Sequence, residues 1–182
     1  VFGLPMMYRS LLEAQRARPR RVDSLRLAVY AMATMPDEDL KATIETFGCG
    51  FSLMFGQTEM SPVATFFRPE HQLSHAGAVG TPATNVQVGI MDESGALLPW
   101  GQTGEIVYRS PQALTEYLRD DGATAEVFRG GWFHSGDVGF FDSDGILWFK
   151  DRFKDVIKSG GENVSSQEVE KAIYACSPEV AE

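Results

Sequence analysis

The strongest constraint on the fold is a strand–helix–strand pattern in the first third of the chain. Residues 25–31 (LRLAVYA) and 51–55 (FSLMF) are short apolar runs typical of buried strands. Between them, residues 35–48 have helical spacing, with a proline and three acidic residues at the start and Gly48 at the end. Two strands joined through a helix by short links predict a parallel α/β layer. Another helix is predicted over residues 4–16.

The pattern changes in the middle of the chain, where turn residues separate short apolar runs. Residues 86–99 and 103–110 are predicted strands. Residues 139–151 (GFFDSDGILWFKD) are predicted to form a hairpin that turns at Asp144 and Gly145. This region is therefore expected to be antiparallel sheet.

The last predicted segment covers residues 154–176 and holds a strand, a glycine turn and a helix. Ser165 and Glu168 have the spacing of a capping box, in which each side chain bonds the backbone N–H of the other residue. The helix is therefore expected to begin at this point.

Charge and composition limit the partners. The 182 residues carry a formal charge of −9 at pH 7 without a long basic run, which argues against nucleic acid as the main partner. A small anionic ligand is compatible with this charge, because a site can be locally positive. Cys49 and Cys176 lie in apolar segments and are predicted to be buried free thiols. No apolar run could span a bilayer and the first residues do not resemble a signal peptide, so we expect a cytoplasmic protein.

The segment FGQTE combines four kinds of group that a nucleotide site uses. Phe55 could stack on a planar base, and Gly56 could let a ligand approach the backbone. Thr58 could donate to a phosphate oxygen, and Glu59 could hold magnesium, which prefers oxygen ligands. The structural alternative is a strand end and a turn, followed by a helix that Thr58 caps.

The segment GGWFHSGDVGFFDSDG holds the next candidates. Asp137 is predicted to lie between a glycine turn and a strand, where a carboxylate can accept from two sugar hydroxyls. The alternative is a turn aspartate that bonds its own backbone. Asp142 and Asp144 lack the full calcium-loop spacing and are assigned to a hairpin turn. His134 has no partner that the sequence identifies, so a structural or surface role is favoured over acid–base chemistry.

The segment DRFKDVIKSGGENV alternates basic and acidic residues and contains paired glycines. Arg152 follows a predicted strand and could reach ribose or phosphate oxygens through its fork of donors. Lys154 and Lys158 add positive charge nearby, and Gly160 and Gly161 form a flexible turn. The alternative is a charged connector, although a connector of this kind is itself functional if a domain turns there.

The order of these segments is more specific than any one of them. FGQTE, then TGEIVYRS, then the stretch from GGWFHSGD to SSQEVE resembles the adenylate-forming superfamily. This superfamily includes acyl-CoA synthetases, adenylation domains of peptide synthetases and beetle luciferases. The resemblance covers nearly the whole chain and is densest from Leu53 to Glu170. It implies a reaction in which a carboxylate attacks the α-phosphate of ATP, after which the thiol of coenzyme A takes the acyl group from the acyl-adenylate.

The resemblance also implies roles for the candidate residues. Phe55 would lie beside adenine, Thr58 would contact the α-phosphate and Glu59 would bind Mg²⁺. Asp137 would take the ribose hydroxyls, with Arg152 beside it. ATP and AMP, Mg²⁺ and coenzyme A are therefore the expected cofactors and substrates, together with a small carboxylic acid.

The remaining roles concern a mobile C-terminal domain. Lys154 falls at the expected hinge, about which this domain rotates between the two half-reactions. Lys158, Gly160 and Gly161 would lie on the part that changes faces, with the glycine turn bordering the pantetheine channel. The turn SGGENV resembles acyl-CoA ligases, and FGQTEMSPV resembles fatty-acyl-CoA ligases more than aryl or amino-acid activators.

The expected fold is α/β with three units. Residues 1–85 would close the second αβα half of a large N-terminal domain. Residues 86–151 would form a distorted antiparallel barrel, and residues 152–182 would begin a small α+β C-terminal domain.

Two pieces of the superfamily pattern do not occur in these residues: a Ser/Thr/Gly-rich phosphate loop and a catalytic lysine late in the C-terminal domain. We therefore expect a partial chain that is inactive alone. In YAMATMP, Met32 falls where the superfamily often has a glycine pair, so it either reshapes the pocket or points into the core. Ser166 stands where a proline often opens the last helix, and a small effect is expected.

Two other functions remain open at this point. The first is an adenylation domain that loads the acyl group onto a carrier protein. The second is a nonenzymatic relative that binds nucleotide or acts as a scaffold. Residues Thr58, Glu59, Asp137, Arg152 and Lys154 together favour an enzyme over a scaffold.

Overall fold

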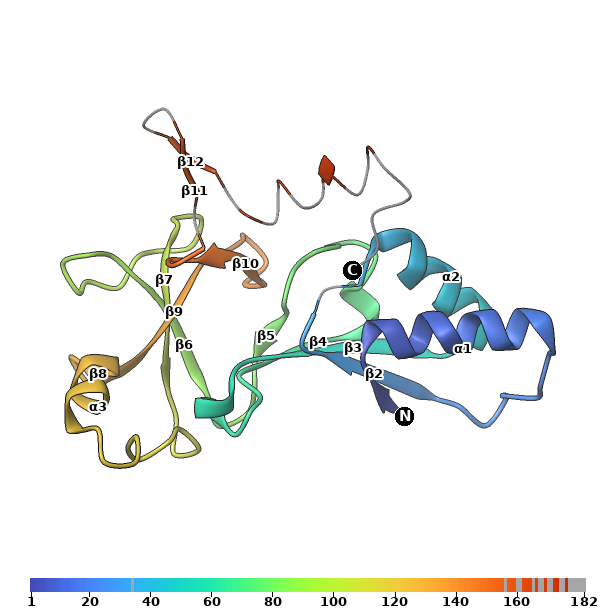
Figure 1. Ribbon diagram of the computed structural model, residues 1–182, viewed down its shortest axis with the longest axis horizontal. Coiled ribbons are helices and arrows are strands. Elements are labelled where there is room, and N and C mark those ends of the chain that lie inside the picture. The colour runs from blue at the N-terminus through green and yellow to red at the C-terminus, as the bar shows by residue number, and fades with distance from the viewer. Residues whose placement is uncertain are drawn as a thin grey trace.

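The computed structural model describes residues 1–33, 35–155, 157–159, 162–164, 166, 169, 172–173 and 176. Figure 1 shows two sheets side by side, with two long helices packed on the first sheet and the short helix α3 beside the second. The predicted α/β class is confirmed by this arrangement.

The first sheet has the order β1-β2-β3-β4-β5 among the described residues. Its strands are β1 (Phe2–Gly3), β2 (Leu27–Ala31), β3 (Gly50–Phe55), β4 (Thr65–Phe67) and β5 (Thr81–Pro82). The pairs β1·β2 and β2·β3 are parallel, which confirms the predicted parallel layer. The pairs β3·β4 and β4·β5 are antiparallel, and the sequence did not predict strands there.

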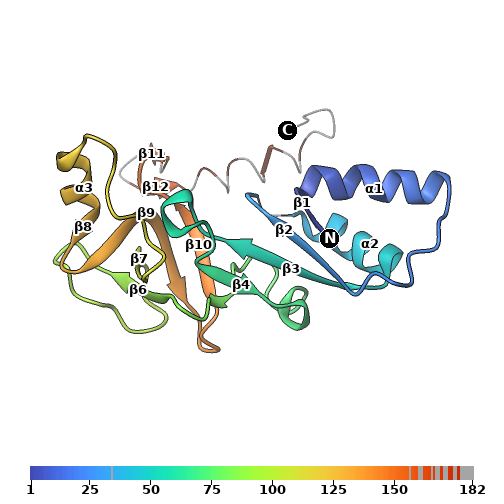
Figure 2. The ribbon, with the colours of Figure 1, turned by 90° about the horizontal axis from the view of Figure 1, so that it is seen from below.

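Helices α1 (Pro5–Ala17) and α2 (Asp37–Phe47) form the helical layer (Figure 2). Tyr8 of α1 packs edge-on against Phe51 of β3, with ring centroids 5.2 Å apart. Arg9 of α1 pairs with Asp39 of α2 at 3.1 Å. Gly48 ends α2 in the left-handed conformation with φ 60°, as the sequence predicted, because a residue without Cβ adopts it at no steric cost.

The second sheet is antiparallel, with the order β10-β9-β7-β6 and β8 beside β9. Its strands are β6 (Gln87–Met91), β7 (Gly104–Arg109), β8 (Phe128–Arg129), β9 (Trp132–Phe141) and β10 (Leu147–Arg152). The short elements are α3 (Asp121–Val127), the 3₁₀ helices η1 (Thr58–Met60) and η2 (Pro69–His71), and the pair β11 (Ile157–Ser159) and β12 (Glu162–Val164). The predicted antiparallel region and the hairpin between β9 and β10 are confirmed.

The two sheets meet where the residues just before β5 pair with the start of β10. Val79 and Gly80 exchange backbone hydrogen bonds with Leu147 of β10, each 2.8 Å long. Gly80 has φ +97°, and a Cβ there would lie 2.2 Å from the carbonyl oxygen of Phe66. Only glycine fits this crossing, and the buried core therefore continues from one sheet to the other.

The chain passes from the first sheet to the second between Pro82, which ends β5, and Gln87, which begins β6. This crossing lies close to the predicted boundary between residues 85 and 86. As limits of domains, 1–85, 86–151 and 152–182 remain predictions. No helix within the described residues combines the length and apolarity that crossing a membrane requires.

The C-terminal part is described only at separate residues. Ser166, Val169 and Cys176 are helical, whereas Ser165 and Glu168 of the predicted capping box lie outside the described residues. The backbone N–H of Ser166 donates to the buried Asp151 of β10 at 2.6 Å, and its hydroxyl donates at 3.0 Å. Ser166, which stands where the superfamily often has a proline, therefore attaches the C-terminal segment to the second sheet.

The two thiols differ in environment. Cys49 is buried, as predicted, and burial raises its pKa. Cys176 is exposed, so the prediction of a buried thiol is wrong there. The apolar residues around it signalled a helix face rather than a core position.

Candidate active site

The candidate site begins at the end of β3. Phe55 closes this strand, and its ring centroid lies 5.6 Å from that of Phe149 on β10. The next residue, Gly56, has no free space around it: a Cβ there would lie 2.2 Å from the carbonyl oxygen of Pro62 and 2.6 Å from the nitrogen of Ala64. The missing side chain therefore lets residues 62–64 fold back against the strand end.

This fold-back presents Thr58 and Glu59 on the 3₁₀ helix η1. Thr58 is exposed at its first position, but Gln57 occupies the N-cap and no side chain caps the helix, so the capping alternative for Thr58 is wrong. Glu59 Oε1 accepts a hydrogen bond from the hydroxyl of Tyr117 at 3.0 Å, and Oε2 lies 3.4 Å from Nε2 of Gln57. No ion pair among the described residues includes Glu59.

Asp137 lies within β9, not between a turn and a strand as predicted. Only 3% of the residue is exposed, and its Oδ1 accepts from Nε of Arg152 at 3.0 Å. The alternative of a turn aspartate that bonds its own backbone is not what the structure shows. The antiparallel register places Asp137 opposite Arg152, so the sheet itself brings together two residues that the sequence separates by a hairpin.

The electrostatics single out Asp137. Burial raises the pKa of its carboxyl to about 6, although the nearby guanidinium of Arg152 opposes the shift. The negative charges of Glu105 and Glu59 also raise this pKa, which shows that Glu59 and Asp137 share one electrostatic environment. A buried carboxylate with a raised pKa beside a second carboxylate is a common feature of functional sites.

Arg152 ends β10, and its side chain is 58% exposed. A β-bulge between Phe149 and Asp151 shifts the register just before it. The guanidinium thus contacts Asp137 on one side and remains open to a ligand on the other.

A Glu–His pair next to Asp137 was not found by the sequence analysis. Nδ1 of His134 lies 2.7 Å from Oε2 of Glu105, and Oε1 of Glu105 accepts from the backbone N–H of Gly136 at 3.1 Å. Arg129 also contacts His134, at 3.3 Å. The pair holds the backbone just before Asp137. Glu105 lies on β7 and His134 on the adjacent strand β9. Predicting this pair from the sequence would have required knowledge of how these two strands align.

Tyr117 was also not found, because nothing in its local sequence points to Glu59. Burial raises the pKa of its hydroxyl, and the hydrogen bond and the charge of Glu59 raise it further. The hydroxyl therefore stays protonated at neutral pH and remains a donor to Glu59.

The other sequence candidates follow β10 in the chain. Lys154 is exposed in the turn after β10. Lys158 belongs to β11 by its backbone, and nothing is described of its side chain. Gly160 and Gly161 lie outside the described residues.

Met32 follows β2 and does not enter the core. It has φ 73°, in the left-handed region, and it is 86% exposed. Its predecessor Ala31 pairs with Met54 of β3, one residue before Phe55. Of the two possibilities for Met32, the structure therefore excludes burial in the core and places the residue at the same strand edge as Phe55.

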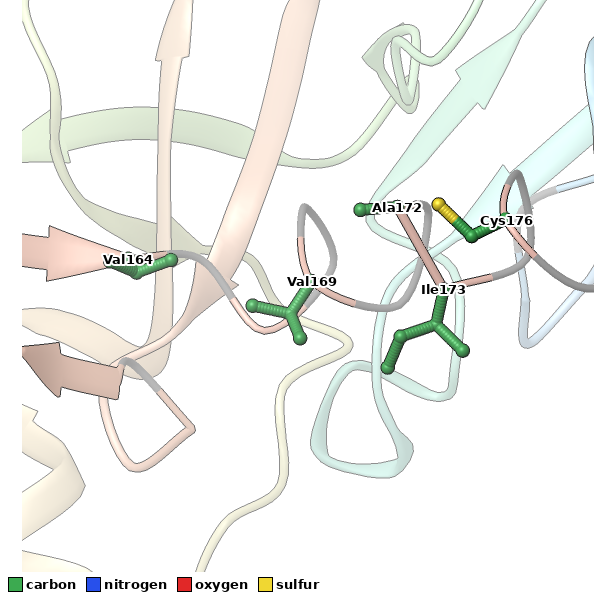
Figure 3. A pocket seen from close by; sticks show the side chains of 5 residues that line it. All are labelled: Val164, Val169, Ala172, Ile173 and Cys176. Atoms are coloured by element: carbon green, nitrogen blue, oxygen red, sulfur yellow. The ribbon is translucent and has the colours of Figure 1, made fainter.

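A separate apolar hollow of ≈ 410 Å³ lies in the C-terminal segment. Figure 3 shows the side chains that line it, which are Val164, Val169, Ala172, Ile173 and Cys176. None of the site residues lines it, so it belongs to a different feature of the molecule.

Fold and site together define an α/β protein whose candidate site lies at the junction of a mixed sheet and an antiparallel sheet. Residues 1–118 match the family described as AMP-binding enzyme, and the chain belongs to this family. The superfamily that the sequence resembles is thereby confirmed.

Curated relatives and solved structures agree with this assignment. The chain is 38% identical over 174 residues to a feruloyl-CoA synthase of an Amycolatopsis species, covering 96% of this chain and 35% of that protein. It is 34% identical to an indoleacetate–CoA ligase of Aromatoleum aromaticum, covering 98% of this chain and 36% of the relative. The o-succinylbenzoate CoA synthetase of Bacillus subtilis, solved with its acyl-adenylate intermediate, matches with a TM-score of 0.89 and 29% identity over 100% of this chain and 36% of that chain. The chain thus spans little more than a third of the length of these proteins.

Proposed function

We propose that this chain supplies the nucleotide-binding portion of an AMP-forming acid–CoA ligase. Such an enzyme activates a carboxylic acid with ATP to an acyl-adenylate and then forms the acyl-CoA thioester. The observation that carries the proposal is the buried Asp137, paired with Arg152 at 3.0 Å and within the electrostatic influence of Glu59. Catalysis of this kind depends on positioning and charge stabilisation more than on a protein nucleophile, and no nucleophile is required of these residues.

The geometry supports a division of labour in the site. The carboxylate of Asp137 would accept from the ribose hydroxyls, and the exposed guanidinium of Arg152 would reach the same sugar or the phosphate. The ring of Phe55, at the strand edge, would lie against the adenine. Thr58 is exposed directly beside Glu59, which suits a donor to the α-phosphate.

A magnesium ion fits the residues around Glu59. The carboxylate has no cationic partner in the described part of the chain, and Oε1 of its neighbour Gln57 is a buried acceptor without a hydrogen-bond donor there. The described residues hold no cluster of three or more candidate metal ligands. One carboxylate combined with phosphate oxygens and water is the usual way that proteins bind Mg²⁺. When bound with ATP, the ion would neutralise charge on the phosphates.

The proposed role of the C-terminal segment is transfer of the acyl group to coenzyme A. Lys154 lies in an exposed turn directly after the strand that ends with Arg152, a suitable place for a hinge. We propose that the segment carrying Lys158, Gly160 and Gly161 turns about this point and that the paired glycines border the pantetheine channel.

We propose an aromatic or arylalkyl carboxylic acid as the substrate, in place of the fatty acid that the sequence suggested. The support comes from the relatives, whose names refer to feruloyl, indoleacetate and succinylbenzoate. A fatty acid remains the alternative for the test.

We also propose that these 182 residues alone do not complete the reaction. They contain no Ser/Thr/Gly-rich phosphate loop and span little more than a third of the relatives' length. Missing transition-state contacts to phosphate are each worth about 3–4 kcal/mol. Full-rate thioester formation by the isolated chain would contradict this part of the proposal.

The decisive test is carboxylate-dependent exchange of pyrophosphate into ATP by the intact enzyme that contains this chain. The panel runs from acetate and palmitate to ferulate and indoleacetate. We expect exchange with an aromatic acid and a loss of about 100-fold in Asp137→Asn, because two charge-assisted hydrogen bonds are weakened. Asp144→Asn, an exposed carboxylate on the same hairpin, is the matched control and should retain exchange.

The other outcomes separate the alternatives. Exchange followed by transfer to a phosphopantetheine-bearing carrier protein, without transfer to free coenzyme A, would identify a carrier-loading enzyme. A folded protein that gives no exchange with any acid would overturn the enzymatic proposal and favour a scaffold.

A further inference from the structure

Residues 110–120 form a strap between β7 and α3 that contacts the loop carrying Glu59. Nε2 of Gln112 donates to the carbonyl oxygens of Met60 and Val63, both at 2.6 Å. The hydroxyl of Ser61 donates back to the carbonyl oxygen of Gln112 at 2.8 Å. These bonds join segments about fifty residues apart, and they fix the loop between β3 and β4.

The strap also contacts Glu59 itself at two points. The backbone N–H of Leu114 donates to the carbonyl oxygen of Glu59 at 2.7 Å. The hydroxyl of Tyr117 donates to Oε1 of the same residue at 3.0 Å. Main chain and carboxylate of Glu59 are therefore held by one segment, which restricts both the position and the rotation of the side chain.

Tyr117 is in turn anchored at the start of α3. Its backbone N–H donates to the hydroxyl of Thr124 at 2.9 Å, and that hydroxyl donates to the carbonyl oxygen of Asp120 at 2.8 Å. Asp120 caps α3 by accepting from the backbone N–H of Ala123 at 2.9 Å. Tyr117 thus precedes α3 but is hydrogen-bonded to its first turn, which fixes the backbone that carries the phenol.

The hydrogen bonds to Glu59 leave room for a cation. A carboxylate offers about four lone-pair positions, and Tyr117 and Gln57 each use one. Some residues do not bind a metal themselves but hydrogen-bond a carboxylate that does. Mutation of such a residue commonly weakens metal affinity by about 10-fold to 100-fold. A donor that fixes Glu59 in one rotamer would lower the entropy lost when the ion binds.

We propose that Tyr117 is a positioning residue that orients the carboxylate of Glu59 for the metal ion of the metal–ATP complex. This inference rests on the proposed function, in which Glu59 holds that ion. It assigns to the strap a role in catalysis besides its structural one.

The test measures metal binding rather than turnover. Mn²⁺ serves as the probe, and its binding to the intact enzyme is followed by electron paramagnetic resonance with an ATP analogue whose α and β phosphorus atoms are joined by a methylene bridge. We expect Tyr117→Phe to weaken Mn²⁺ binding by about 10-fold or more. The apparent affinity for the carboxylic acid substrate should stay unchanged.

Tyr8→Phe is the matched control. It also removes one phenolic hydroxyl, which in this case donates to the carbonyl oxygen of Val29 at 2.9 Å within the α1–β2 layer. This variant should lower the melting temperature without changing Mn²⁺ binding. An equal loss of Mn²⁺ binding in both variants would show a general effect on folding and overturn the positioning role.

Glu59→Gln separates this inference from the proposed function. If Glu59→Gln leaves Mn²⁺ binding and exchange intact, the proposed metal role of Glu59 fails, and the inference falls with it. If Glu59→Gln weakens Mn²⁺ binding but Tyr117→Phe does not, only the inference is wrong. In a variant that combines Glu59→Gln with Tyr117→Phe, Mn²⁺ binding should be no weaker than in Glu59→Gln alone. A further loss of Mn²⁺ binding would show that Tyr117 does not act through Glu59.

Discussion

Asp137 and Asp142 lie five positions apart at the β9–β10 hairpin, yet their surroundings are opposite. Asp142 accepts hydrogen bonds from the backbone N–H groups of Asp144 and Ile146 and from the indole N–H of Trp148. Burial alone would raise its pKa, but these hydrogen bonds together lower it below the ordinary value. Asp137 is nearly fully buried, and burial outweighs its single guanidinium partner and raises its pKa to about 6.

The difference separates a structural carboxylate from a candidate catalytic-site carboxylate. The protein stabilises the charge of Asp142 with its own donors, so that residue serves the fold. It leaves the charge of Asp137 poorly stabilised, which costs stability unless a ligand supplies donors. Two ribose hydroxyls would supply them.

The largest expected effect comes from Asp137→Asn. A folded pKa of about 6 above the ordinary 3.8 means that the native state binds the proton more strongly than the unfolded state, so ionisation of Asp137 reduces stability as pH rises from about 4 to 6. The full cost above pH 6 is about 3 kcal/mol. We expect Asp137→Asn to be more stable than the wild type at pH 8 by up to this amount in urea unfolding, with the difference vanishing near pH 4. Lower stability of the variant at pH 8 would contradict the conclusion that the charge of Asp137 is poorly stabilised.

The second effect has the opposite sign. Asp142→Ala leaves the N–H groups of Ile146 and Trp148 without their acceptor and should destabilise the protein by about 2–3 kcal/mol at pH 7. Because the folded pKa of Asp142 is lowered, the stability it contributes is present above pH 3.8 and is lost as pH falls through the folded pKa. Urea unfolding of wild type and variant at pH 7 and pH 3 measures both parts. A stabilised variant at pH 7 would contradict the structural assignment.

The third prediction concerns nucleotide binding by the wild type. The ionised carboxylate of Asp137 accepts from two ribose hydroxyls more strongly than the protonated acid, in which one oxygen becomes a donor, so AMP affinity should be constant above pH 7 and fall as pH drops through about 6. Calorimetric titration of the intact enzyme with AMP between pH 5 and pH 8 tests this. Adenine, which lacks the ribose, serves as the control ligand and should not follow the same curve.

The smallest effect is expected at the tip of the hairpin. Asp144 lies 3.1 Å from Nε2 of His75, but its side chain is 68% exposed. An exposed pair of this kind contributes little, so Asp144→Ala should cost less than about 0.5 kcal/mol. Thermal unfolding in low and high salt tests this, and a loss comparable to that of Asp142→Ala would mean that exposure does not distinguish these carboxylates.

Local patterns in the sequence were sufficient for much of the architecture. Apolar runs and short links identified β2, α2 and β3, because each depends on the spacing of neighbouring residues. Gly48 and the hairpin at Asp144 and Gly145 followed from backbone conformations that few residues adopt. The family could also be assigned, because its motifs are contiguous in the chain and their order is specific.

Tertiary structure alone decided how the site is built. The burial of Asp137, its pairing with Arg152 and the Glu105–His134 pair depend on the register of antiparallel strands, which the sequence does not specify locally. The bond from Tyr117 to Glu59 joins residues 58 positions apart. The pKa of a carboxyl follows from burial and neighbouring charges, and both arise only when distant segments pack together. The sequence by itself determined which groups are present and which local elements carry them, whereas packing determined which of those groups meet and whose charge is left for a ligand to stabilise.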